Sequence, residues 1–184
     1  MIIKSPVIEQ LRAATAAAHQ RLDANLNVIE RLSTLEGRRE MLPRYFRMHR
    51  AAERLARPWL ADVPTLELDG RERLGLVAAD LDALELLHPA EDEPPAPLTS
   101  RAEAMGVLYV LEGSTLGGRM IKKAVHARGC DLTGLSFLDP YGRDTGARWR
   151  EFVTVLEREA GDDVPGARRG AILGFTHAEA CLIG

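Results

Sequence analysis

The sequence has few cysteines, no long apolar run and no N-terminal hydrophobic segment. Its two cysteines, Cys130 and Cys181, are too few for a disulfide framework and lack the spacing of a metal site. We therefore expect unpaired thiols in a reducing cytoplasm. No run reaches the roughly 18 apolar residues of a membrane span. Lys4 and Pro6 come before any hydrophobic region develops, which argues against a secretory signal. A soluble, cytoplasmic protein is expected, with no membrane contact.

Net charge and aromatic residues are also low. A formal charge of −3 at pH 7 gives no sign of a nucleic-acid-binding protein, although arginine clusters could still hold a small anion. Only 5% of the residues are aromatic, and the chain is rich in alanine, leucine, arginine and glutamate, which are good helix formers. We predict an all-α protein. A length of 184 residues fits one domain over residues 1–184.

Helical spacing of apolar residues predicts six to eight helices and no strand. The first helix is expected over residues 6–29. A second opens at a capping box that begins with Ser33, and Pro43 should kink or break it after Met41. Residues 88–97 contain four prolines and three acids, so we expect an exposed connector there. The remaining predicted helices cover residues 45–60, 69–87, 100–129 and 148–160, followed by a final helix after residue 166.

Paired metal ligands are missing as well. No two of the five histidines lie four residues apart, and the carboxylates show none of the paired spacing of di-iron bundles. A metal ion held by protein ligands alone is therefore not expected. A single histidine is nevertheless enough to serve as the axial ligand of haem iron, because the macrocycle already holds the metal.

A glycine-rich helix is the most unusual feature that the chain does contain. Each glycine in a helix interior costs about 1 kcal/mol relative to alanine. At about 100° per residue, Gly106, Gly113 and Gly117 form one bare stripe. Such a stripe either packs tightly against another helix or faces a bulky or flat ligand. His19, at the edge of the apolar face of the first helix, is expected to be semi-buried. Together the two features favour a flat ligand between these helices.

Three segments of the chain resemble haem oxygenases, specifically the bacterial biliverdin-forming kind often found beside bacteriophytochromes. They are LRAATAAAHQRLD (residues 11–23), LYVLEGSTLGG (residues 108–118) and LSFL (residues 135–138). The resemblance extends from about residue 6 to the C-terminus, and the middle segment is its most specific part. It implies a helical fold with haem held between the first helix and a kinked distal helix.

The resemblance also implies a reaction and its site residues. Haem, as substrate and cofactor, would be cleaved with O₂ and reducing equivalents to biliverdin, carbon monoxide and ferrous iron. His19 resembles the proximal iron ligand, and Gly113 and Gly117 resemble the glycines that let the distal backbone approach bound dioxygen. Ser114 stands where mammalian-type members carry an aspartate, so Gly113, Ser114 and Gly117 are the expected catalytic positions. Implied partners are an electron donor, either a ferredoxin or a reductase, and a bacteriophytochrome that accepts biliverdin.

Cations are expected at the mouth of the pocket to bind the haem propionates. Arg12 lies seven residues before His19 and therefore on nearly the same helix face, and Arg150 matches a basic position in the family. Glu112 is expected on a solvated face. Two other functions remain open at this stage: a haem-storage protein without turnover, and a helical interaction module whose glycines only pack.

Overall fold

The computed structural model describes residues 5–91 and 96–184, and within these ranges it is all-helical, as predicted. The N-terminal residues 1–4 and the central part of the predicted connector lie outside the described residues. The described flanks of that connector have no regular secondary structure and are mostly exposed. The seven α-helices of the described ranges are α1 (Pro6–Leu26), α2 (Val28–Leu32), α3 (Leu35–Leu60), α4 (Leu74–Ala83), α5 (Arg101–Ala127), α6 (Thr145–Ala160) and α7 (Val164–Leu182).

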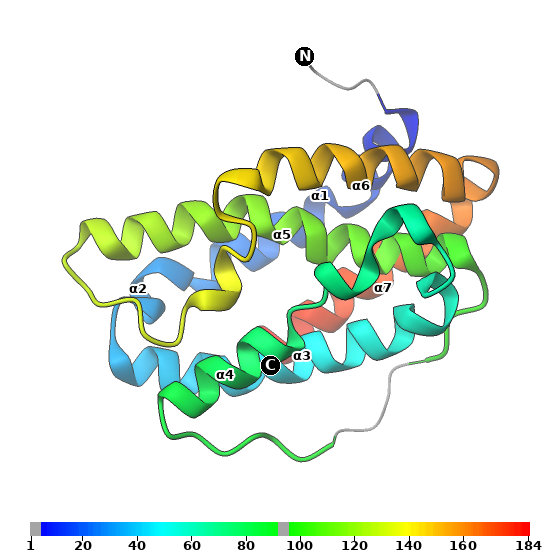
Figure 1. Cartoon of the computed structure of the whole chain (residues 1–184). Coiled ribbons are helices and arrows are strands. Elements are labelled where there is room, and N and C mark those ends of the chain that lie inside the picture. Colours follow the sequence, from blue (N-terminus) through cyan, green and yellow to red (C-terminus); the bar gives the residue numbers. More distant parts are fainter. Residues whose placement is uncertain (1–4, 92–95) are drawn as a thin grey trace.

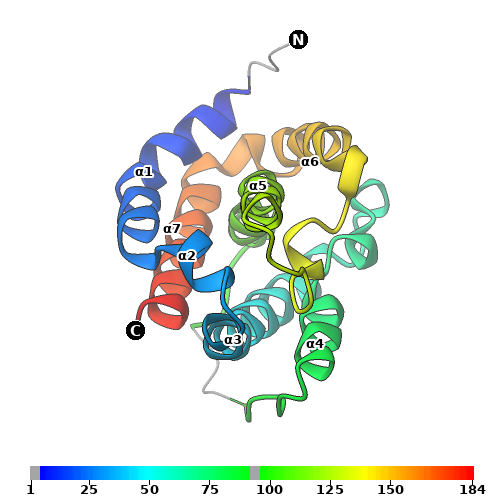
Figure 2. The ribbon, with the colours of Figure 1, turned by 90° about the vertical axis from the view of Figure 1, so that its left-hand side faces the viewer.

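The glycine-rich helix α5 runs through the middle of the molecule (Figure 1). Figure 2, a view close to its axis, shows α1, α7, α3 and α6 arranged around it. Its N-terminus is capped as predicted, because the Ser100 hydroxyl accepts a hydrogen bond from the Glu103 amide at 3.2 Å. Its end is also close to the prediction, since Gly129 follows with a φ of +76°. Capping at both ends is a local property, which explains why the sequence located this helix.

A kink or a break was predicted at Pro43, and the break does not occur. One continuous helix, α3, contains both Pro43 and Pro58, and its N-cap is Thr34 rather than Ser33. The Thr34 hydroxyl accepts the Gly37 amide at 3.0 Å. The side chains of Met41 and Leu42, just before Pro43, are fully buried, and tertiary packing of this apolar face supports the helix despite the hydrogen bond that the proline removes.

Two other boundaries differ from the prediction because of single backbone conformations. Helix α1 ends at Leu26 since Asn27 adopts the left-handed conformation, with φ 43° and ψ 44°. Helix α4 is shorter than the predicted segment over residues 69–87, because a 3₁₀ turn covers Leu68–Gly70 and Glu85 has a φ of +56°. No described helix is long and apolar enough to cross a membrane.

Helix α7 supports both α1 and α5, and it approaches α5 closely at glycines. A Cβ added at Gly106 would lie 2.0 Å from the Ala167 carbonyl oxygen, and one added at Gly170 would lie 1.9 Å from the Glu103 carbonyl oxygen. Neither glycine can therefore be replaced without moving backbone. Helix packing, the simpler interpretation of the stripe, is thus correct for Gly106.

Candidate functional site

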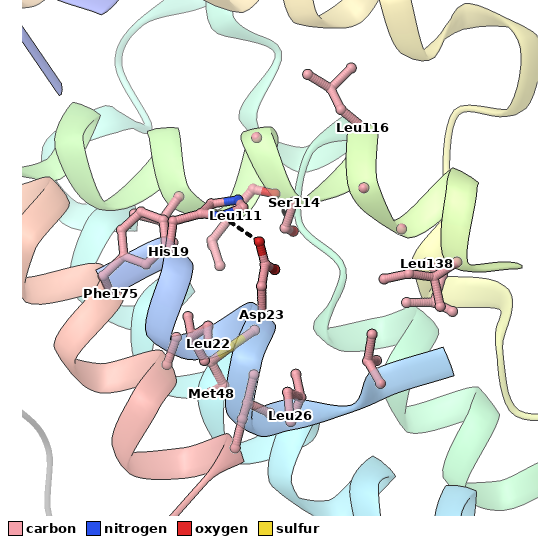
Figure 3. Close-up of a pocket in the computed structure, with 18 of the residues that line it drawn as sticks. His19, Leu22, Asp23, Leu26, Met48, Leu111, Ser114, Leu116, Leu138 and Phe175 are labelled. Carbon is pink, nitrogen blue, oxygen red and sulfur yellow. Dashed lines mark hydrogen bonds and ion pairs between the residues drawn. The ribbon is translucent and has the colours of Figure 1, made fainter. Parts of the chain in front are cut away.

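A cavity of about 620 Å³ lies between α1 and α5, with further walls from α3, α7 and the segment that follows α5 (Figure 3). Its volume is within the range typical of sites for small molecules and cofactors, roughly 300–1,000 Å³. Much of the lining is apolar or aromatic, including Leu22, Leu26, Met48, Phe137, Trp149 and Phe175. Such a lining suits a large, mostly apolar ligand.

His19 lies on the α1 wall of this cavity and is held by Asp23, one helical turn further along. Its Nδ1 is 2.9 Å from Asp23 Oδ2, and its ring centroid is 5.9 Å from that of Phe175 (Figure 3). Because Asp23 engages Nδ1, Nε2 carries the lone pair that can bind a metal. The prediction of a semi-buried His19 was wrong: its side chain is 64% exposed, because it opens into a wide, accessible cavity.

Two glycines of the stripe, Gly113 and Gly117, line the cavity, whereas the third, Gly106, packs against α7. Beyond the adjoining residues and backbone of α5, no atom lies within 4 Å of a Cβ built on Gly117, and the Trp149 ring is 3.8 Å from one built on Gly113. A Cβ on the neighbouring Gly118 would instead lie 2.3 Å from the Leu138 carbonyl oxygen. The stripe is therefore divided along the helix: Gly106 makes a helix contact, and Gly113 and Gly117 leave one wall of the cavity bare.

Ser114 is joined to a buried arginine that sequence reasoning missed. Arg73 Nη1 donates to Ser114 Oγ at 3.1 Å, its Nη2 donates to the Leu111 carbonyl oxygen, and Ser114 Oγ donates to the same carbonyl at 2.7 Å. The Arg73 side chain lines the cavity although only 2% of the residue is exposed. Burial lowers its pKa, while Glu112, Tyr141 and Glu53 oppose this shift. The α5 wall of the cavity therefore has a guanidinium beside Ser114 and not an acid.

The backbone of Arg73 is held by a buried carboxylate. Glu53 Oε1 accepts the Arg73 amide at 2.9 Å and Oε2 accepts the Leu74 amide at 3.1 Å, at the positive N-terminal end of α4. Glu53 Oε1 also lies 3.0 Å from His49 Nδ1. Burial lowers the pKa of the His49 imidazole, and Arg73 lowers it further, against the opposing effect of Glu53. His49, which lines the cavity, is therefore neutral near pH 7.

The two arginines predicted at the pocket mouth have different positions. Arg12 is exposed and lines the cavity, near Tyr109. Burial raises the pKa of the Tyr109 phenol, and Thr15 and Arg12 oppose this shift. Arg150 is exposed on α6 and is not among the residues that line the cavity in the described part of the chain. The structure thus brings Arg12 to the site and leaves Arg150 outside its lining.

The expectation that Glu112 is solvated was wrong. Its side chain is 1% exposed, with Arg71 Nη1 donating to it at 2.5 Å and the Tyr141 hydroxyl donating to it at 2.7 Å. Arg71, equally buried, comes from the segment before α4. Helical periodicity could not reveal this pair, since the partner lies far away in the sequence.

Several residues of the cavity were not identified from the sequence. Asp23 carried a usable signal, because a carboxylate four residues after a histidine lies on the same helix face. Tyr109, His49 and Arg73 carried none, since an isolated aromatic or charged residue does not reveal which cavity it will line. Only the tertiary structure brings them to the site.

A comparison with solved structures identifies the fold. The chain is similar to the haem oxygenase of Neisseria meningitidis, solved with NO and CO bound, with a TM-score of 0.74 and 22% sequence identity. The superposition covers 96% of this chain and 92% of that one. This all-α fold is therefore the fold of a haem oxygenase.

Sequence comparison identifies the family. No family model matches the chain. A curated haem oxygenase from Xanthomonas campestris pv. campestris (strain 8004) is 31% identical over 147 residues, which cover 78% of this chain and 87% of that protein. The chain belongs to the haem oxygenase family, and the protein is an enzyme.

Proposed function

We propose that this protein binds haem between α1 and α5 and cleaves it, with O₂ and reducing equivalents, to biliverdin, carbon monoxide and ferrous iron. The observation that carries the proposal is the arrangement of two facing walls of one cavity. On α1 lies a histidine that Asp23 orients, and on α5 lie glycines that leave that wall bare. The cavity is large and mostly apolar, which suits the porphyrin. Family membership favours turnover over storage of haem.

In this proposal, bound haem supplies the iron that activates dioxygen and is itself the molecule oxidised. The chain supplies position and polarity. His19 Nε2 binds the iron, and Asp23 fixes the ring by accepting its Nδ1 proton. Gly113 and Gly117 leave the α5 wall of the cavity bare, where the other face of the macrocycle would lie, and Ser114 would contribute a hydroxyl on that wall.

Arginines and a phenol near the mouth are proposed to bind the propionates. Arg12 and Tyr109 both line the cavity and lie close together, so a carboxylate there can accept hydrogen bonds from both. Arg150 is proposed as a second cation, supported by the resemblance alone. We propose that residues 1–184 act as one haem-binding domain in the cytoplasm.

The proposed partners are an electron donor, a ferredoxin or a reductase, and a bacteriophytochrome that receives biliverdin. The phytochrome is supported only by the resemblance. An acidic donor is supported by charge: residues 113–130 contain no acid but include Arg119, Lys122 and Lys123, and the apolar Met120 among them is 65% exposed. Charge complementarity of this kind accelerates association.

The binding step is tested by mixing the purified protein with hemin. We expect a shifted Soret band that is lost or strongly altered in His19→Ala. His126→Ala is the matched control, because His126 is exposed on α5 and outside the cavity lining. An unshifted Soret band in the wild-type protein, or an unchanged one in His19→Ala, would refute the assignment.

Turnover is tested by adding ascorbate, or a ferredoxin with its reductase, under oxygen and in the presence of catalase. We expect the Soret band to be replaced by the broad red absorption of biliverdin, and chromatography against isomer standards identifies the product. Haem that remains intact, or that decays only when catalase is omitted, would favour the storage protein instead.

A further inference from the structure

The part of α1 that carries His19 has no buried side chain to hold it in place. The buried residues of α1 lie either at or before Thr15, or at Leu26, the last residue of the helix. Between these positions, residues 16–25 are all exposed or half-buried. Most of the stability of a helix in a protein comes from packing of its apolar face. This stretch of α1 therefore depends on other contacts.

The N-terminal part of α1 is held more firmly. It contributes several side chains to the core, and its first turn is fixed to α6 by Glu157. One carboxylate oxygen of Glu157, Oε1, accepts hydrogen bonds from the Val7 amide, at 3.1 Å, and from the Ser5 hydroxyl. A carboxylate also suits the positive N-terminal end of a helix. The firm part of α1 ends at Thr15, one turn before His19.

Two residues of α7, one turn apart, contact the stretch of α1 that has no buried side chain. The Phe175 ring centroid is 5.9 Å from that of His19. The Glu179 carboxylate accepts two hydrogen bonds from the Arg21 guanidinium, at 2.7 Å from Nε and 3.0 Å from Nη2. Exposed ion pairs contribute little on average, but a bidentate arginine–carboxylate pair also fixes the relative orientation of its two groups. Arg21 is only two residues from His19, so the pair acts close to the histidine.

Helix α7 is itself fixed against α5, the opposite wall of the cavity. The two helices approach closely at Gly106 and Gly170, where an added Cβ would meet backbone, and α7 packs against both α5 and α1 (Figure 2). Contacts between α1 and α7 therefore determine where His19 lies relative to α5. Neither Arg21 nor Glu179 is among the described residues that line the cavity. The pair can affect a ligand there only through the position of α1 or through its charges.

We propose that Arg21 and Glu179 are positioning residues for His19. Their bidentate ion pair holds residues 16–25 of α1 against α7, and it thereby sets the position of His19 Nε2 relative to the α5 wall. The consequence for haem rests on the proposed function. The effect on α1 is a property of the haem-free protein and is tested separately.

Hydrogen exchange of the haem-free protein tests the effect on α1. Arg21→Gln and Glu179→Gln should each raise the exchange rate of the amides of residues 16–25 roughly two- to fivefold, as expected for the loss of one exposed ion pair. Amides of residues 6–15 should exchange at the wild-type rate, because Glu157 and the core still hold them. Wild-type exchange over residues 16–25 in both variants would overturn the proposal.

Arg57→Gln is the matched control. Arg57 of α3 forms a bidentate pair with Glu72, at 2.7 Å from Nε and 2.6 Å from Nη2, and its exposure is similar: 45% and 25% for these two side chains, against 58% and 22% for Arg21 and Glu179. This control should leave the exchange of residues 16–25 unchanged. Equal acceleration in Arg57→Gln would show a general loss of stability and would overturn the proposal.

The hemin complex tests the effect on His19. Arg21→Gln removes a positive charge and Glu179→Gln removes a negative one, so an effect of charge alone would have opposite signs in the two variants. An effect of position should have the same sign. Both variants should release hemin to apomyoglobin roughly two- to fivefold faster than wild type. Both should also shift the iron–histidine stretching band of the ferrous complex in the same direction, as measured by resonance Raman spectroscopy.

The double variant Arg21→Gln/Glu179→Gln should release hemin no faster than either single variant, because each substitution removes the same interaction. Opposite effects in the two single variants, additive effects in the double variant, or an unchanged iron–histidine band in both single variants would each overturn the proposal. Failure of the wild-type protein to bind hemin would instead refute the proposed function. Hydrogen exchange of the haem-free protein would still decide whether the pair holds α1, so the two failures are distinguishable.

Discussion

Replacing two glycines of α5 by alanine should have opposite effects on stability, although both lie on one stripe of the same helix. Gly106 faces α7: an added Cβ would lie 2.0 Å from the Ala167 carbonyl oxygen and 2.7 Å from the Ala171 amide nitrogen. Gly117 faces the cavity, where nothing lies within 4 Å of an added Cβ. The same methyl group therefore meets backbone at one position and open space at the other.

The expected magnitudes follow from these distances. At Gly117, alanine should stabilise the haem-free protein by about 1 kcal/mol through helix propensity, which raises the melting temperature by about 2–4 °C in a domain of this size. At Gly106 the same gain is outweighed by overpacking, which costs about 1–3 kcal/mol. Because both close contacts are to backbone atoms, the upper end applies, and a fall of about 4–8 °C is expected.

Hemin binding should rank the two variants in the reverse order. The Gly117→Ala methyl group occupies space that the proposal assigns to haem, so hemin affinity should fall roughly 5- to 150-fold, equivalent to about 1–3 kcal/mol of overpacking. Gly106→Ala, measured below its melting temperature, should bind hemin with wild-type affinity, since Gly106 does not line the cavity.

Thermal unfolding of the haem-free variants by circular dichroism, followed by hemin titration, checks both halves of this prediction. A lower melting temperature for Gly117→Ala would show that Gly117 is packed rather than open. Unchanged hemin affinity in that variant would place the ligand on another face of α5. Either result would refute the division of the glycine stripe.

Two further predictions concern buried polar groups. Glu112→Gln should lower the free energy of unfolding by about 3–5 kcal/mol, because it removes the buried counter-charge of Arg71. Urea denaturation measures this loss. Glu151→Gln is the control: Glu151 is an exposed partner 3.9 Å from Arg71, so its replacement should cost less than about 1 kcal/mol. A loss as small for Glu112→Gln would contradict the buried pair. The second prediction concerns His49, whose folded-state pKa is lowered by burial and by Arg73. The folded protein therefore favours neutral His49, and this contributes stability at pH values above the unfolded-state pKa of about 6.5. That contribution is lost as the pH falls below about 6.5, because the unfolded state then binds a proton that the folded state does not. His49→Gln should therefore flatten the decrease in unfolding free energy between about pH 7 and pH 5, whereas His126→Gln, at an exposed site, should not; equal slopes in all three proteins would rule out this role of His49.

The sequence by itself determined the all-α class, the Ser100 cap, the end of α5 near Gly129, and the pairing of His19 with glycines on a second helix. These features depend on local chemistry: the period of apolar residues, a side chain that caps its own helix, and the absence of Cβ atoms. Asp23 was not identified from the sequence, but the same local chemistry could have found it, since its distance from His19 is set by one turn of α1.

Only the tertiary structure decided which glycines pack and which line the cavity, because Gly106 and Gly117 differ in what lies opposite them and not in their own helix. It also kept α3 continuous through Pro43, since burial of the surrounding side chains offsets the lost hydrogen bond. Arg73 and Glu112 depended on it most. Both side chains are buried and form hydrogen bonds with partners dozens of residues away in the sequence. The order of charged residues along the chain does not specify which partner each of them will contact.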